Sequence, residues 1–96
     1  MSEYYAYVVV FSGISSEEMT EKLEEYEDTI VNWYRPSLRN TVFVVSDLPA
    51  KLLTRFLRKR IKGLSSMLVL DAATDRNGWL PESAWEFLRH PKPVGK

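Results

Sequence analysis

The sequence predicts an α+β fold, and three observations lead to this class. The chain of 96 residues contains four short apolar segments of the length of β-strands, and three of them are rich in Val and aromatic residues. Two segments between them carry apolar residues at helical spacing and begin with helix-start signals. The predicted order is strand, helix, strand, strand, helix, strand, and a Trp-rich helical segment follows it.

The first strand is predicted from Tyr4 to Phe11, where Val and Tyr dominate. Ser15 follows, and Glu18 stands three residues later, which is the capping box that marks a helix start. The helix is expected to reach Tyr26 or Glu27. Its polar positions are mostly Glu and Asp, so the sequence indicates a strongly acidic helix.

The middle of the chain predicts two strands and a second helix. Segments 29–35 and 41–46 are the strands, and turn-forming residues join them. Asp47 is expected to cap a helix over 48–62, with Pro49 in its first turn, where proline is tolerated.

The last third of the chain predicts one more strand and a short helix. The strand covers 66–71, and Asp75-Arg76-Asn77-Gly78 forms a turn. The segment 79–89 reads as a short helix with Pro81 near its start, and it is too apolar to stay in solvent, so it must dock. We expect one domain over 1–90 and a flexible, Pro-rich tail over 91–96.

The order of these elements is the split βαβ pattern of ferredoxin-like folds. It predicts a βαββαβ sandwich, in which a four-stranded antiparallel sheet has its first and third strands in the centre. Right-handed crossovers place both helices on one face of that sheet.

Both faces of the predicted sheet are apolar. We expect the small residues Ala6, Val8 and Val10 to face the two helices, with Val42 and Val44. The aromatic set then faces away, and an apolar face of this kind requires burial by the C-terminal segment, by a second copy of the chain, or by both. The residues expected at a homodimer interface are Tyr5, Tyr7, Phe11, Phe43, Trp79 and Trp85.

Two other uses of the aromatic face stay open. RNA-recognition domains share this topology and stack bases on sheet aromatics, and Arg39, Phe43 and Val44 match part of their third-strand signature. A regulatory site for a small molecule is the other use, for which the sequence shows no distinctive residue.

The composition restricts the possible functions. Lys+Arg 13 balances Asp+Glu 13, so a nucleic-acid partner must be recognised by local charge. The absence of Cys excludes disulfides and thiolate chemistry and suits a reducing compartment. No apolar run approaches the length of a membrane span, and the N-terminus lacks a signal-peptide pattern, so a cytoplasmic protein without membrane contact is expected.

The junction Ser12-Gly13 lies where many enzymes place their chemistry. A phosphate loop needs more glycines, and a serine nucleophile needs a base, whereas the only histidine is His90 in a Pro-flanked segment. We therefore expect no catalytic residue, no metal and no cofactor. The topology does place Ser12, Gly13, Arg35, Arg39 and Ser65 at one sheet end near a helix start, where an anion can bind. The alternative is a capped helix with solvated arginines.

The basic second helix is the stronger local signal for a partner. Its cations are suited to a phosphate backbone. The alternatives are a solvated surface, pairing with the acidic first helix, or a protein partner. The candidate nucleic-acid-binding residues are Lys51, Arg55, Arg58, Lys59, Lys62, Arg35 and Arg39.

The chain also resembles a group of small ferredoxin-like proteins related to the CRISPR-associated adaptation nuclease subunit (Cas-two-like). The resemblance covers about residues 4–88 and lies in the Tyr/Val-rich first strand, in the run Asn40 to Asp47, in Leu48-Pro49-Ala50 before a basic helix, and in Ala84-Trp85. It implies homodimers that join through sheet faces.

Members of that group proposed as nucleases carry a metal-binding Asp at the end of the first strand, where this chain has Ser12. A hydroxyl is a poor ligand for a hard cation, so a non-catalytic module that binds nucleic acid or protein is expected rather than a metal-dependent endonuclease. The remaining carboxylates, Asp47 and Asp71, are expected at the opposite end of the sheet.

Overall fold

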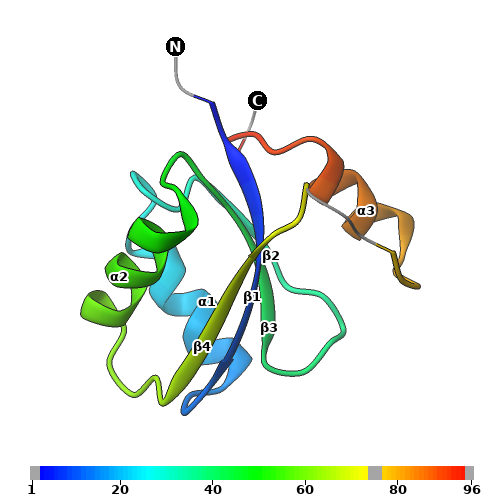
Figure 1. Cartoon of the computed structure of the whole chain (residues 1–96). Coiled ribbons are helices and arrows are strands. Elements are labelled where there is room, and N and C mark those ends of the chain that lie inside the picture. The colour runs from blue at the N-terminus through cyan, green and yellow to red at the C-terminus, as the bar shows by residue number, and fades with distance from the viewer. Residues whose placement is uncertain (1–2, 74–76, 95–96) are drawn as a thin grey trace.

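A computed structural model describes residues 3–73 and 77–94 and shows a four-stranded antiparallel sheet with three helices (Figure 1). The elements are β1 (Tyr5–Ser12), α1 (Ser16–Glu24), β2 (Asn32–Tyr34), β3 (Thr41–Ser46), α2 (Ala50–Arg60), β4 (Ser66–Asp71) and α3 (Glu82–Arg89). The turn predicted at 75–78 and the end of the tail lie partly outside the described residues.

The strands are ordered β2-β3-β1-β4, so β1 and β3 occupy the centre as predicted. Each neighbouring pair is antiparallel. In the β1–β3 pair, Tyr7 lies opposite Val44 and Val9 lies opposite Val42. Since directly opposed residues share a face of the sheet, this register decides which side chains meet the helices.

The predicted assignment of β1 side chains to the two faces is wrong. Tyr7, Val9 and Phe11 belong to the main core together with the buried side chains of α1 and α2. Ala6 and Val8 belong to the second cluster, under α3. The prediction considered the size of side chains on each strand separately, whereas the pairing of β1 with β3 selects the face.

The second sheet face is covered in part by α3, so the docking predicted for the C-terminal segment is confirmed. Ala84 and Leu88 are buried there against Ala6 and Phe43. Tyr34 stacks on Phe43 with ring centroids 5.9 Å apart and also meets Phe87. Figure 1 shows α3 on the side of the sheet opposite α1 and α2.

The helix starts differ in how well they follow local signals. The capping box is present, because the Glu18 N–H donates to the Ser15 hydroxyl over 3.1 Å. Asp47 is not the cap of α2, which corrects the prediction: α2 begins after Pro49, with no side-chain cap. The hydroxyl of buried Ser46 accepts the Leu48 N–H instead, at 3.2 Å.

The strand β2 is shorter than predicted, at Asn32–Tyr34. The N–H groups of Thr29 and Ile30 donate to the Tyr26 carbonyl, so the chain leaves α1 through further turns before it becomes extended. The described part of the tail lies beside β2, where the Val94 N–H donates to the Val31 carbonyl over 3.0 Å. In the described residues, no helix has the length and apolar character needed to cross a bilayer.

Tyr7 joins the sheet to the segment before α2, since its hydroxyl donates to the Leu48 carbonyl over 2.8 Å. Burial raises the pKa of this hydroxyl, and the nearby Asp71 and Tyr5 raise it further. A group whose pKa is raised by folding stabilises the protein below its unfolded pKa and loses that contribution as the pH rises through the folded value.

We therefore expect Tyr7→Phe to cost about 1 kcal/mol at neutral pH, because the Leu48 carbonyl loses its donor. Above about pH 10, where the phenol ionises in the unfolded chain, the parent should lose stability more steeply than the variant. Urea unfolding across the alkaline range measures this, and parallel stability curves would contradict it.

Candidate nucleic-acid interface

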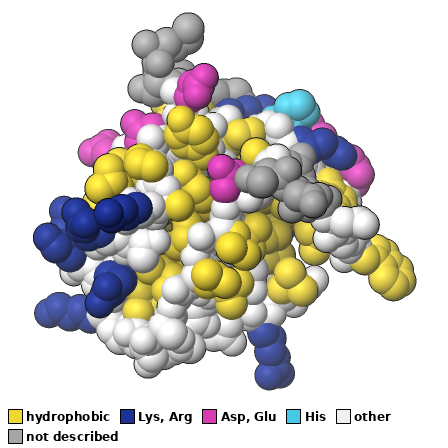
Figure 2. Space-filling model, in the orientation of Figure 1, with side chains coloured by type: hydrophobic (Ala, Val, Ile, Leu, Met, Phe, Trp, Pro, Cys, Tyr) yellow, Lys and Arg dark blue, Asp and Glu magenta, His cyan; other side chains and the backbone are white. Residues whose placement is uncertain are grey.

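The helix α2 separates apolar from basic residues along its length. Leu53 and Leu57 are fully buried against the sheet. Its basic side chains lie on the solvent side and are exposed, and Figure 2 shows Lys and Arg gathered over this helix at the left of the view. A shallow hollow of about 560 Å³ follows this surface and is lined by Lys51, Thr54, Arg55, Arg58 and Lys59. We call these four basic residues the α2 patch.

The α2 patch is not neutralised by the acidic helix, which was one alternative. None of the ion pairs among the described residues joins α1 to α2. The ammonium group of Lys22 in α1 pairs with the carboxylate of Glu25, the residue just after this helix, over an N–O distance of 3.6 Å. The ring of Tyr26, just after α1, instead lies edge-on to the ring of Phe56 on α2, with ring centroids 5.5 Å apart. The cations of the patch therefore keep their charge available for a partner.

Lys62 and Arg60 extend the basic character beyond the patch. Lys62 is exposed and lies just after the end of α2. Arg60 was not among the candidates, and its guanidinium lies over the Phe56 ring at 4.9 Å. Because Arg60 makes this cation–π contact, it is less free to follow a phosphate than its neighbours.

Arg35 and Arg39 do not join the α2 patch. Both are exposed on the connection between β2 and β3. Leu38, between them, lines a groove with Trp85 and Leu88, so this connection lies toward α3 on the other side of the sheet. The seven candidate nucleic-acid-binding residues therefore divide into a group at α2 and a separate pair.

The contacts of the structure bring together Ser12, Gly13 and Ser65, three of the five residues predicted at one end of the sheet. The Ser65 N–H donates to the Ser12 carbonyl over 2.9 Å, and the Ser12 and Ser66 hydroxyls lie 2.7 Å apart. Ser66 was not among the candidates, because the contact depends on the β1–β4 register, which places the two serines opposite each other. Gly13 packs against the backbone of Gly63 and Ser65.

The six residues expected at a dimer interface have different positions. Tyr7, Phe11 and Phe43 are buried within the chain and have no surface left for a partner. Tyr5 is partly exposed. Trp85, on α3, is half-buried and packs against the second cluster under this helix, whereas Trp79 is 99% exposed. The helix α3 covers only part of its sheet face. The exposed apolar residues on the uncovered part, or beside it, are Val10, Leu38, Leu68 and Leu70. We call these four residues the open sheet face.

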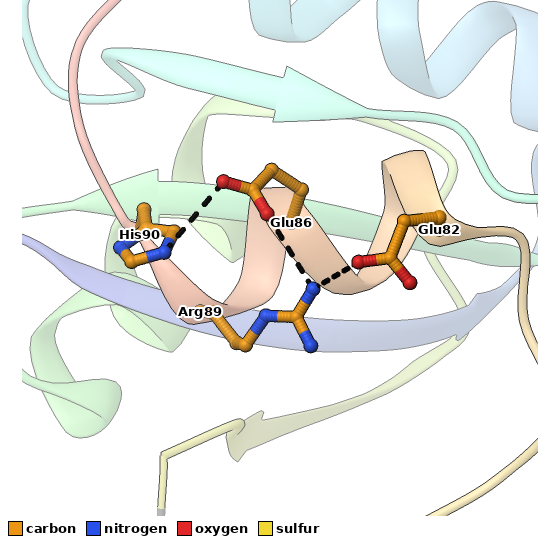
Figure 3. A network of polar contacts seen from close by, with 4 residues as sticks. All are labelled: Glu82, Glu86, Arg89 and His90. Atoms are coloured by element: carbon orange, nitrogen blue, oxygen red, sulfur yellow. Dashed lines mark hydrogen bonds and ion pairs between the residues drawn. The ribbon is translucent and has the colours of Figure 1, made fainter.

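The single histidine, His90, belongs to a polar network at the end of α3 (Figure 3). His90 Nε2 is 3.6 Å from the Glu86 carboxylate, and Arg89 binds both Glu86 and Glu82. The hydrogen bond to Glu82 raises the pKa of Arg89, which therefore keeps its charge. This network links side chains on the solvent side of α3, whereas the Ser12 hydroxyl contacts Ser66.

Carboxylates do not gather near the end of β1. Asp71 lies opposite Tyr7, far along β1 from Ser12, and its side chain accepts the Ala73 N–H. Among residues 3–73 and 77–94, no three His, Asp or Glu side chains are grouped in a way that could hold a metal ion.

Comparisons with known proteins add no relative: no family model, no curated protein and no solved structure matches this chain. Its function is therefore argued from its own residues.

Proposed function

We propose that this protein is a non-catalytic, homodimeric module of ferredoxin-like fold that binds the phosphate backbone of nucleic acid through α2. The order of its elements and the strand order β2-β3-β1-β4 are compatible with that fold. The observation that carries the proposal is the α2 patch, whose cations are exposed, adjacent and without ion pairs in the described chain. A protein partner is the alternative for the same helix.

The charge distribution confines the proposed contact to one region. The whole chain has no net charge, so attraction to a polyanion depends on the local field of α2. The acidic side chains of α1, including exposed Glu21 and Glu24, repel a phosphate backbone on their own side. Contacts of this kind read charge rather than bases, so binding is expected to tolerate any sequence.

The double variant Arg55→Glu/Lys59→Glu should abolish binding to a labelled DNA duplex. Both residues are exposed and lie off the buried stripe of α2, so the fold should persist. For the parent, about three or four phosphate contacts predict a log–log slope of affinity against salt near −3. Fluorescence anisotropy at several salt concentrations measures both quantities.

A matched control is Lys22→Glu/Lys92→Glu, which changes the net charge equally at two exposed positions outside the α2 patch. It should retain most of the affinity. If both double variants bind as the parent does, the site lies outside the α2 patch. The RNA-recognition alternative has less support, because Phe43 is buried under α3. Absence of binding at low salt would favour a protein partner, and cleavage of the duplex with magnesium or manganese would favour the nuclease alternative.

The homodimer is proposed on a surface that differs from the one expected. The open sheet face exposes Leu68 by 55% and Leu70 by 48%, on the edge strand β4, whose outer side has no partner strand in the described sheet. A second copy of the chain can cover these exposed leucines by packing its own open sheet face against them.

Light scattering should therefore give a dimer for the parent and a monomer for Leu68→Ser at the same concentration. Leu52→Ser is the matched control, because Leu52 is similarly exposed but lies on α2. A parent that stays monomeric at high micromolar concentration would disprove the dimer and leave the nucleic-acid proposal intact.

A further inference from the structure

A second hollow continues the α2 patch toward the sheet. It has a volume of about 350 Å³ and lies between α2 and the start of β4. Thr54 and Arg58 line both this hollow and the one along the patch, so the two are continuous. Its lining residues are Thr54, Arg58, Leu64, Ser65, Ser66 and Met67. No carboxylate is among them, and Arg58 contributes a full positive charge.

Ser65 is held at this hollow by the backbone around it. Its N–H donates to the Ser12 carbonyl over 2.9 Å. Gly13 and Gly63, both with positive φ, let the two loops approach closely, and an added Cβ at Gly13 would lie only 3.0 Å from the Ser65 hydroxyl oxygen. Among the described residues this hydroxyl forms no hydrogen bond, and it is exposed. The backbone of Ser65 is therefore fixed, and its exposed hydroxyl has no acceptor among the described residues.

The other hydroxyls along the hollow are already engaged. Thr54 donates to the Ala50 carbonyl over 2.8 Å within α2. Ser66 shares a hydrogen bond with Ser12, at the rim away from α2. Two groups remain for a ligand. The Ser65 hydroxyl is a neutral hydrogen-bond donor, and the Arg58 guanidinium is a cation with several N–H donors. Serine and arginine side chains are common partners of backbone phosphates in nucleic-acid complexes.

We propose that Ser65 and Arg58 form a phosphate subsite that extends the α2 interface to the loop before β4. The inference builds on the proposed function, since it assigns one further phosphate of the same nucleic acid. That phosphate takes the guanidinium of Arg58 on one side and the hydroxyl of Ser65 on the other. Because the loop is already fixed by its backbone contacts, little ordering is required on binding.

Substitutions of Arg58 and of Ser65 are expected to change the salt dependence of DNA affinity differently. Replacing Arg58 by Gln removes a charge that displaces a counterion, so affinity falls and the salt slope becomes shallower by about 0.9. Replacing Ser65 by Ala removes a neutral hydrogen bond, so affinity falls about 3- to 10-fold, while the slope stays unchanged. A residue that only supports the fold would not produce this separation.

The experiment measures anisotropy of a labelled DNA duplex across a salt series with Ser65→Ala, Arg58→Gln and the double variant. Ser37→Ala is the control, because Ser37 is exposed on the β2–β3 connection outside both hollows. If one phosphate is shared, the double variant should lose less affinity than the product of the two single losses. Circular dichroism confirms that each variant is folded.

The subsite is overturned if Ser65→Ala binds as tightly as Ser37→Ala, or if its salt slope becomes shallower. If either result is found while Arg55→Glu/Lys59→Glu still abolishes binding, the subsite is disproved and the proposed function is not contradicted. A parent that does not bind the duplex overturns both.

Discussion

Leu88→Ala should lower the free energy of unfolding by about 2–5 kcal/mol, whereas Trp79→Ala should change it by less than about 0.5 kcal/mol. Leu88 is 4% exposed and packs in the cluster of Ala6, Phe43 and Ala84, so its removal leaves a cavity between α3 and the sheet. Trp79 is 99% exposed and loses no burial when truncated. Side-chain size alone would rank these two residues in the opposite order.

Urea unfolding of the two variants and the parent measures this difference. A chain that ends before Trp79 should be less stable than Leu88→Ala, because it also loses the contacts of Tyr34 with Phe87 and Ser83. Equal stability of Leu88→Ala and the parent would mean that α3 does not hold its position on the sheet in solution. A large loss in Trp79→Ala would place that side chain in a contact, such as a dimer interface.

Gly13→Ala should cost about 2–4 kcal/mol, the second large effect. Gly13 has φ of 103°, a conformation that other residues adopt at a cost of about 1–3 kcal/mol. A Cβ there would lie 2.1 Å from the Gly63 carbonyl oxygen and 2.7 Å from the Ser65 nitrogen. These atoms belong to the backbone, so relief requires the loops to separate and weakens the hydrogen bond from Ser65 to Ser12.

Gly78→Ala is the matched control for this variant. The nearest atom to an added Cβ at Gly78 is in Trp85, at 3.9 Å, which is an ordinary contact. Thermal unfolding should therefore separate the two alanine variants by several degrees or more for a domain of this size. Similar melting temperatures would show that the contact between the loops at Gly13 and Gly63 is loose, and would also weaken the case for a fixed Ser65.

Features that depend on neighbouring residues could be predicted from the sequence. The boundaries of β3 and β4 and the capping of α1 by Ser15 agree with the structure. The α2 patch was also predictable, because helical spacing places Lys51, Arg55 and Lys59 away from the buried leucines. In each case the signal and the structure it specifies lie within one or two turns of chain.

Two of the failed predictions have different causes. The cap expected at Asp47 failed for a local reason, because Pro49 delays the helix and the Ser46 hydroxyl accepts the Leu48 N–H instead. The faces of β1 were exchanged because each strand was considered alone, although the pairing of Val9 with Val42 selects them. Only the second error comes from an interaction that forms when separate segments meet.

The same distinction applies to the candidate site. The sequence alone determined that α2 carries a row of cations and that α1 is acidic, since both follow from residue types at helical spacing. Only the tertiary structure decided that the rows do not pair, since none of the ion pairs among the described residues joins α1 to α2. It also decided that Ser65 lies in the same hollow as Arg58, since that position depends on how closely the backbone of Gly13 approaches Gly63. The strand register and this close packing are long-range contacts, which no local pattern in the chain encodes.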